Sequence, residues 1–464
     1  MKVLADWLTG WLVVRWVCGA PTGAPTGWLA TPKHTGMSLC RLPGHPAQAP
    51  GRVGWLAAVT KLAQGQGETR ARRTMPRRPA VRAAGPLHTV HPPRCTHITM
   101  RIDDIRQRLH ALGAKPTHAQ RLLRQWANAL PLAAGPRQPE HWLPTAVRDA
   151  LPTLVADWQG LATLQSQHPG DDGSVRLLVA LADGQAVEAV LLPRDGLCVS
   201  TQVGCAVGCV FCMTGQAGLL RQVGSAEIVA QVALARGLRP VKKVVFMGMG
   251  EPAHNLDNVL DAIDLLGTAG NIGHKNLVLS TVGDVRLFER LMDRATDTGS
   301  NPVRPALALS LHTTKAALRE QLLPRAPRLT PDWLVAQAEA YARASGYPVQ
   351  LQWTLLAGIN DGDDEIEALA ALLAGKYMVL NLIPYNSVDG LDFERPSWER
   401  AAEMARQLHR RGVLTKLRHS AGQDVEGGCG QLRARAVGGG AADGAAAAPQ
   451  TVAIVRRPKP VKHD

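Results

Sequence analysis

Three closely and regularly spaced cysteines are the residues in this chain best suited to chemistry. Cys205, Cys209 and Cys212 form the pattern C-x3-C-x2-C, in a chain of 464 residues with eight cysteines in all. A structural zinc site needs four ligands and often uses two CxxC pairs, but no second pair is present. Three free thiols within eight residues would be an uncommon accident in a chain so poor in cysteine. Three thiolates on one loop can instead hold three irons of a 4Fe-4S cluster and leave the fourth iron open.

The sequence around this triplet resembles that of the radical S-adenosylmethionine (SAM) enzymes. The triplet directly follows a predicted strand and precedes a series of β/α units, and the aromatic Phe211 stands before the last cysteine. The resemblance implies that the open iron binds the amino and carboxylate groups of SAM. One electron from the cluster would then cleave the sulfonium and produce a radical that abstracts hydrogen.

Residues at the ends of successive predicted strands outline one pocket for SAM. In a β/α barrel the active site lies at the carboxyl ends of the strands. Taken singly, each of these residues could belong to an ordinary turn, and only their shared position indicates a site. They are Gly250 and Glu251 in "MGMGEP", Ser280 in "LST", Ser310, Leu311 and His312 in "SLH", and Asn386 in "NLIPYN".

Two cysteines outside the triplet allow either a structural or a chemical role. Cys198 lies seven residues before Cys205 and could be a buried strand cysteine. Cys429 is flanked by glycines in "GGCGQ", which favours a mobile loop and a reactive thiol.

The segment of about 100–435 resembles the RlmN/Cfr family of radical SAM RNA methyltransferases, through "LCVSTQVGCAVGCVFCMTGQAGLLRQ", "VVFMGMGEPAHNLDNV" and "GQDVEGGCGQL". The resemblance implies that Cys429 becomes S-methylated, that Cys198 resolves the adduct through a transient disulfide, and that Glu188 accepts a proton. It places the SAM contacts on the seven strand-end residues above. It implies methylation of carbon 2 or carbon 8 of an adenosine in large-subunit rRNA, with tRNA as a further substrate. An electron donor such as flavodoxin or ferredoxin, a monomeric state and a cytoplasmic location are also expected.

Two alternatives remain open on the residues alone. A radical SAM enzyme that acts on a peptide or small molecule would have no use for Cys198 and Cys429 as a pair. An iron-sulfur RNA-binding protein without turnover would not cleave SAM.

Hydrophobic periodicity predicts an α/β fold, a partial (β/α)6 radical SAM barrel with a small N-terminal helical domain and a β-hairpin. The expected barrel strands are 243–249, 276–281, 306–312, 349–356 and 378–385, after a first strand at "LCVST". The predicted organisation is a disordered basic extension at 1–99, a helical accessory domain at 100–165, a hairpin linker with Glu188 at 166–197, the barrel at 198–435 and a disordered tail at 436–464.

The net charge of +14 is concentrated near the N-terminus. Residues 1–99 contain thirteen Lys/Arg and two Asp/Glu, whereas the other 365 residues contain 39 and 36. An RNA site in the barrel must therefore be a local patch. The extension also lacks core periodicity, so native translation is expected to begin at Met100. No apolar run is long enough to predict a membrane span, and Asp6 and Arg15 argue against a secretion signal.

Overall fold

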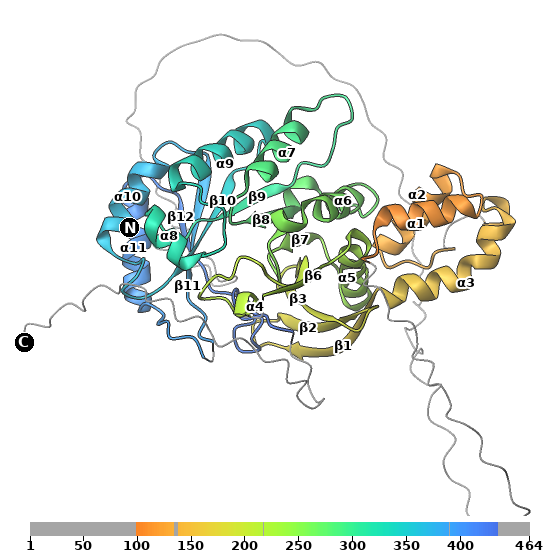
Figure 1. Ribbon diagram of the computed structural model, residues 1–464, viewed down its shortest axis with the longest axis horizontal. Helices are drawn as coiled ribbons and strands as arrows, with labels where there is room; N and C mark the ends of the chain where they lie inside the picture. The colour runs from red at the N-terminus through yellow and green to blue at the C-terminus, as the bar shows by residue number, and fades with distance from the viewer. Residues whose placement is uncertain (1–98, 134–137, 217, 389, 435–464) are drawn as a thin grey trace, which may run out of the picture. The chain divides into compact units, whose positions relative to one another are not determined.

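The computed structural model describes residues 99–133, 138–216, 218–388 and 390–434 (Figure 1). The predicted tail, and the predicted basic extension apart from Thr99, lie outside these ranges. Within the described residues, no helix is both long enough and apolar enough to cross a bilayer.

In the described part of the chain, ten strands form one sheet. The first strands pair as an antiparallel meander, and the later ones pair in parallel. The antiparallel part comprises β1 (Ala162–Pro169), β2 (Val175–Leu181), β3 (Ala186–Leu192) and β4 (Gly196–Cys198). From β4 onward the neighbours are parallel: β7 (Lys243–Phe246), β8 (Leu277–Thr281), β9 (Ala306–Ser310), β10 (Val349–Leu355), β11 (Met378–Pro384) and β12 (Thr415–Leu417).

Helices follow each of the parallel strands from β4 to β11 (Figure 1). They are α5 (Ser225–Leu238), α6 (Leu256–Gly267), α7 (Val285–Thr296), α8 (Ala316–Leu322), α9 (Pro331–Ser345), α10 (Asp363–Leu373) and α11 (Trp398–Arg410). Local chemistry sets their ends: Thr330 Oγ1 accepts from the Trp333 N–H at the start of α9, and Gly346 ends that helix with φ +80°. This alternation confirms the predicted α/β barrel fold.

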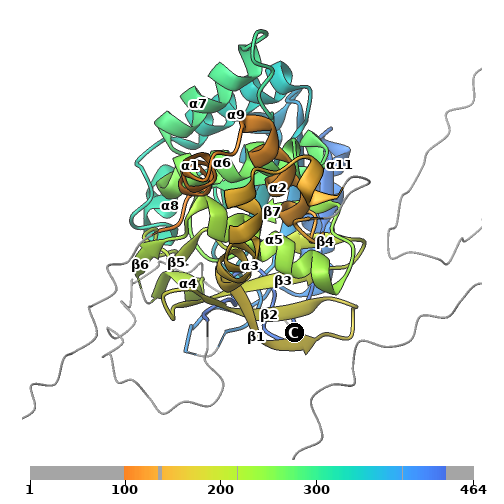
Figure 2. The same ribbon diagram turned by 90° about the vertical axis from the view of Figure 1, so that its right-hand side faces the viewer.

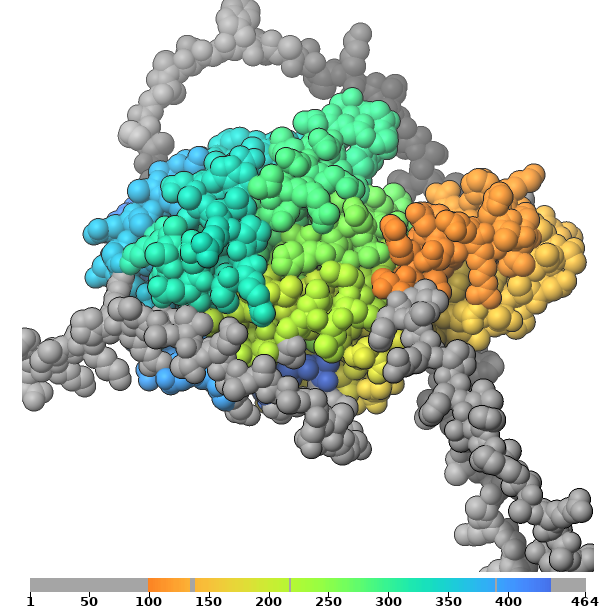
Figure 3. All heavy atoms as spheres, in the orientation of Figure 1, coloured from red at the N-terminus to blue at the C-terminus, as the bar shows by residue number. Residues whose placement is uncertain are grey.

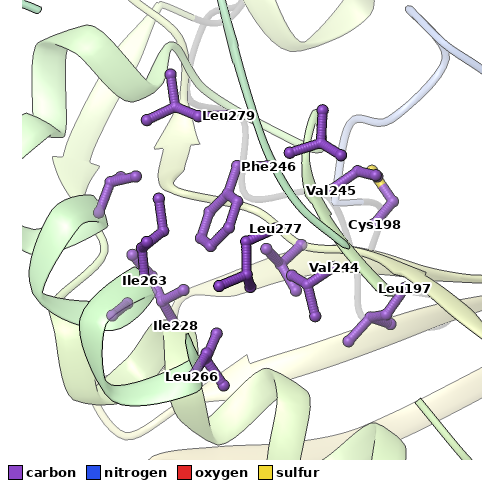
Figure 4. Close-up of a cluster of buried hydrophobic side chains, with 14 of the residues drawn as sticks. Leu197, Cys198, Ile228, Val244, Val245, Phe246, Ile263, Leu266, Leu277 and Leu279 are labelled. Carbon is purple, nitrogen blue, oxygen red and sulfur yellow. The ribbon is translucent and has the colours of Figure 1, made fainter. Parts of the chain in front are cut away.

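Strands β7, β9 and β11 are largely apolar and buried, whereas β10 alternates buried apolar residues with half-buried polar residues. Figure 4 shows Val244 and Phe246 of β7 and Leu277 of β8 among Ile228 of α5 and Ile263 of α6. All five side chains are buried. Such apolar runs are typical of strands in a covered parallel sheet.

Three N-terminal helices, α1 (Ile102–Ala111), α2 (Pro116–Ala127) and α3 (Thr145–Gly160), pack against α5 (Figure 2). The Arg236 guanidinium of α5 donates to the carbonyls of Ala127 (2.6 Å) and Gly270 (2.8 Å) and so joins the helices to the barrel. At the start of the described chain, the Met100 carbonyl accepts from the Ala226 N–H (3.2 Å).

The sequence analysis did not predict β1, which begins inside the range assigned to the helical domain. Its sequence, "ATLQSQHP", lacks the apolar alternation of a half-buried strand, and most of its side chains remain exposed or half-buried. Among the described strands it lies at the edge of the sheet and pairs with β2 alone. Backbone pairing, rather than side-chain burial, therefore extends the predicted hairpin to three strands.

Candidate active site

The three clustered cysteines lie on the loop between two short antiparallel strands, β5 (Gln202–Gly204) and β6 (Leu219–Gln222). The Cys205 N–H donates to the Gly218 carbonyl (2.9 Å), and the Cys212 N–H donates to the Cys209 carbonyl (3.1 Å). Side chains of the loop also pack into a small buried apolar cluster. Its members are Cys205, Val207, Phe211, Val282, Leu322, Leu323, Leu356, Ile359 and Tyr385. Backbone hydrogen bonds and apolar packing therefore both hold the loop in place.

The donor set of this loop fits an iron-sulfur cluster. Burial raises the pKa of Cys205 to about 12, and the charges of Cys212 and Glu251 add to the shift. Burial and the neighbouring Cys212 and Cys205 thiolates also raise the pKa of Cys209. Three poorly solvated thiolates that repel one another need bound cations. Among the described residues no three such side chains converge on a single metal ion, and thiolates that bind three different irons need no such convergence.

Gly250 and Glu251 form the turn after β7. Gly250 has φ +102°, and a Cβ there would lie 2.5 Å from Gln202 Cβ, so only glycine fits. The buried Glu251 carboxylate accepts from the N–H groups of Ala253 and Val282, each at 3.0 Å. Burial raises the pKa of this carboxyl, and the N–H donors oppose the shift. Glu251 therefore ties the end of β7 to the end of β8.

The predicted SAM contacts on β8 and β9 lie on neighbouring strands. Ser280 of β8 is opposite Ala308, and Ser310 is the last residue of β9. Leu311, which follows Ser310, is fully buried, and its N–H donates to the Gln352 carbonyl of β10 (3.1 Å).

His312 connects this strand end to the cysteine loop. It has φ +66° and is buried, and its Nδ1 accepts from the Thr354 N–H (3.0 Å). Its ring meets that of Phe211 edge to face, with centroids 5.0 Å apart. Burial lowers the pKa of His312 to about 3, and the charge of Arg319 makes a smaller contribution in the same direction. The imidazole is therefore neutral near pH 7.

Asn386, at the end of β11, holds the segment that contains Cys429. The buried Asn386 Nδ2 donates to the Cys429 carbonyl and to Ser420 Oγ, each at 2.9 Å. Gly430 follows Cys429, and its carbonyl accepts a hydrogen bond (2.8 Å) from the Met213 N–H, next to Cys212. Figure 3 shows the dark blue end of the described chain at the surface, beside the yellow-green segment that contains the cysteine loop. Cys429 is thereby placed against the loop from far along the chain.

The two remaining cysteines among the described residues are brought within electrostatic reach of each other. Cys198 ends β4 and is buried, whereas Cys429 is exposed, and both thiols are free. Burial raises the pKa of Cys198 to about 12, and the charge of Cys429 contributes. Desolvation of the thiol by the surrounding protein also raises the pKa of Cys429. The charge of Arg418 opposes this shift, and the charge of Cys212 adds to it. Cys429 thus interacts with both Cys198 and the cysteine loop.

Glu188 lies on β3 and is fully buried, with both carboxylate oxygens bonded. Oε1 accepts from the Arg176 guanidinium of β2 (2.5 Å), and Oε2 accepts from the Arg433 N–H (2.8 Å). Arg176 also donates to the Val425 carbonyl (2.6 Å). The hairpin therefore binds the Cys429 segment through Glu188 and Arg176.

Comparison with known proteins agrees with this geometry. Residues 199–373 match the model of the radical SAM superfamily. A probable RNA methyltransferase of Leptothrix cholodnii is 73% identical over 336 residues, which cover 72% of this chain and 95% of that protein. A second probable RNA methyltransferase, from Methylibium petroleiphilum, is 72% identical over 340 residues, which cover 73% of this chain and 94% of that protein. The chain belongs to this radical SAM methyltransferase family.

A solved structure is similar to this methyltransferase in both fold and sequence. It is a radical SAM methyltransferase from Sphaerobacter thermophilus, with a TM-score of 0.61 and 33% sequence identity, and the match covers 73% of this chain and 98% of that one. The prediction of a radical SAM methyltransferase is thus confirmed.

Sequence reasoning missed Arg319 of this radical SAM methyltransferase. The side chain is buried, and its guanidinium donates to the carbonyls of Leu311 (2.8 Å), Ser310 (3.1 Å) and Val282. Its charge favours the thiolate of Cys209. The only sequence signal was an arginine on a short helix, which is ordinarily a solvent-exposed residue.

Proposed function

We propose that this radical SAM methyltransferase adds a methyl group to carbon 2 or carbon 8 of an adenosine in large-subunit rRNA, with tRNA as a second substrate. RNA as the substrate class is supported by the names of the relatives that are 73% and 72% identical. One observation supports the chemistry most strongly. Asn386 and Gly430 hold the Cys429 segment against the cysteine loop, within electrostatic reach of Cys198.

The target carbon explains why a protein thiol is needed. A ring carbon between two nitrogens is electrophilic and does not attack the methyl group of SAM. The Cys429 thiolate can attack it and become S-methylated as S-adenosylhomocysteine leaves. When bound, the 4Fe-4S cluster and a second SAM molecule would supply a radical that abstracts a hydrogen atom. That atom would come from the S-methyl group of Cys429, whose carbon then bonds to the ring carbon.

Three side chains of this chain would complete the reaction. The adduct would lose the ring proton to Glu188 and one electron to an acceptor such as the oxidised cluster, which would leave a thioether between Cys429 and the base. Cys198 gives up its proton and attacks the sulfur of Cys429, so that a disulfide forms as the sulfur–carbon bond breaks. The released carbon takes a proton and becomes the methyl group. A cellular reductant then restores both thiols.

The chain has residues to hold both groups. Cys205, Cys209 and Cys212 would bind the cluster. SAM would contact the strand-end residues Gly250, Glu251, Ser280, Ser310, Leu311, His312 and Asn386. A flavodoxin or ferredoxin would provide the electron. We further propose that the enzyme is a monomer and that it is cytoplasmic; the location follows because a disulfide that must be reduced in each cycle requires a reducing compartment.

The test compares variants of the two mechanistic cysteines after anaerobic reconstitution with iron and sulfide. Cys198→Ala can accept the methyl group and bond to the base but cannot release it, so a nuclease-sensitive, reductant-resistant protein–RNA adduct is expected. Cys429→Ala should retain its cluster and modify no RNA, and the double variant should form no adduct. Mass spectrometry of digested RNA identifies the product of the wild type. Full turnover by Cys198→Ala without adduct would refute the two-cysteine mechanism.

A further inference from the structure

An exposed pair of aromatic rings lies where α11 begins and β12 ends. Trp398 is the first residue of α11, and His419 follows β12. Their rings are stacked, with centroids 4.4 Å apart and planes at 16°. The Trp398 side chain is nevertheless 46% exposed, and His419 is exposed as well. A large flat apolar surface is therefore open to solvent at this point.

The pair lies at the same end of the barrel as Cys429. Helix α11 begins after the carboxyl end of β11, and His419 lies beyond the carboxyl end of β12, which is where barrel active sites form. The residue after His419, Ser420, accepts a hydrogen bond from Asn386, and Asn386 also donates to the Cys429 carbonyl. Two hydrogen bonds therefore connect the neighbour of His419 to the methyl-carrying residue.

Rigid elements hold both rings in place. The Arg400 side chain, on the first turn of α11, donates to the Asp361 carbonyl (Nε, 2.8 Å) and to Asp363 Oδ1 (2.9 Å). On the other side, the Arg418 N–H donates to the Leu382 carbonyl of β11 (2.8 Å). A ring surface that is already ordered loses little entropy when a ligand stacks on it.

Two cations precede His419 on the same segment. Lys416 and Arg418 are exposed on the segment that ends in His419. The Arg418 guanidinium donates to Asn381 Oδ1 of β11 (3.2 Å), and its charge favours the thiolate of Cys429. An aromatic surface beside cations suits single-stranded nucleic acid, whose bases stack and whose phosphates are negative.

We propose that Trp398 and His419 form a stacking platform for an unpaired base of the RNA, next to the adenosine that enters the active site. This inference rests on the proposed function, because it assigns a subsite to the same substrate. The platform would fix the strand beside the target and leave the methylation chemistry to Cys429. Stacking is tolerant of base identity, so the platform would position the RNA rather than read its sequence.

The test measures binding of a fluorescein-labelled, 12-nucleotide single-stranded adenosine RNA by fluorescence anisotropy at several salt concentrations. Trp398→Ala should weaken binding roughly 5-fold to 100-fold, as loss of one stacked base does. Trp398→Phe should restore most of the affinity. The slope of log affinity against log salt concentration should not change, because no phosphate contact is removed. The matched control is Tyr377→Ala, since Tyr377 is 41% exposed but precedes β11, at the opposite end of the strands.

The outcomes separate this inference from the proposed function. If Trp398→Ala binds the oligonucleotide within twofold of the wild type, or if the wild type does not bind it, the platform is wrong, even where the wild type still methylates RNA. Equal losses in Trp398→Ala and Tyr377→Ala would also contradict it. A wild type that methylates no RNA refutes the proposed function instead. Circular dichroism and thermal melting of each variant exclude misfolding, and His419→Ala, which removes the other ring of the platform, takes its place if Trp398→Ala unfolds.

Discussion

Arg319 allows a quantitative test of how the strand ends are held together. Its guanidinium is only 3% exposed and donates to three carbonyl oxygens at the ends of β8 and β9. Arg319→Met keeps a side chain of similar length but removes every donor. The carbonyls of Val282 and Leu311 would then remain buried without these partners.

The expected loss follows from the contacts. Each orphaned buried carbonyl costs about 1–3 kcal/mol, and removal of the buried charge offsets part of the sum. We expect the free energy of unfolding to fall by about 3–5 kcal/mol, the usual range for loss of one member of a buried charged network. Arg319→Lys retains the charge but not the planar fork, so its loss should be about 1–3 kcal/mol.

Urea unfolding monitored by circular dichroism, under reducing conditions, measures these differences. The matched control is Arg325→Gln, because Arg325 comes from the same segment and contacts Gly208 of the cysteine loop but is exposed. That variant should stay within about 0.5 kcal/mol of the wild type. If Arg319→Met also unfolds within 1 kcal/mol of the wild type, roughly its experimental uncertainty, the bonds from Arg319 do not stabilise the strand ends.

Two further perturbations have defined signs. Gly250→Ala should lower the free energy of unfolding by about 2–4 kcal/mol, because its Cβ would lie 2.5 Å from Gln202 Cβ at φ +102°. The control Gly237→Ala should not destabilise the protein, because a Cβ there meets no atom within 4 Å. Equal melting temperatures of the two variants would contradict this prediction. His312 is neutral when folded, with a pKa lowered to about 3, mainly by burial. The unfolded chain binds the extra proton below pH 6.5, so stability should fall by about 2 kcal/mol between pH 7.5 and 5.0. His312→Asn, which tolerates the positive φ, should lose this part of the pH dependence in urea titrations, and an unchanged slope would show that His312 is not its source.

Short-range sequence patterns were enough to predict the scaffold and the metal-binding loop. Strands β7, β9 and β11 have largely apolar runs because they are buried, whereas apolar and polar residues alternate in β10. Turns and helix caps mark the strand ends. The spacing of Cys205, Cys209 and Cys212 is a local property, since all three lie on one loop. Gly250 likewise reports a local requirement, a backbone conformation that other residues rarely adopt.

Edge strand β1 marks the limit of such patterns. It has no apolar alternation, because pairing with β2 supplies its hydrogen bonds while most of its side chains stay exposed or half-buried. Periodicity reports burial, and a strand that buries little gives no periodic signal.

The residues themselves suggested a strand-end pocket and a reactive thiol at Cys429, and the family resemblance suggested the partnership of Cys198, Glu188 and Cys429. Only the tertiary structure decided how these groups meet. Asn386 and Gly430 bring the Cys429 segment to the cysteine loop, and Glu188 meets the backbone of Arg433, from the opposite end of the described chain. Arg319 is an ordinary helix arginine in the sequence and becomes a buried tie between strands only in the folded barrel. The physical reason is that hydrogen bonds and charges act over a few ångströms of space, whatever the separation of the residues along the chain.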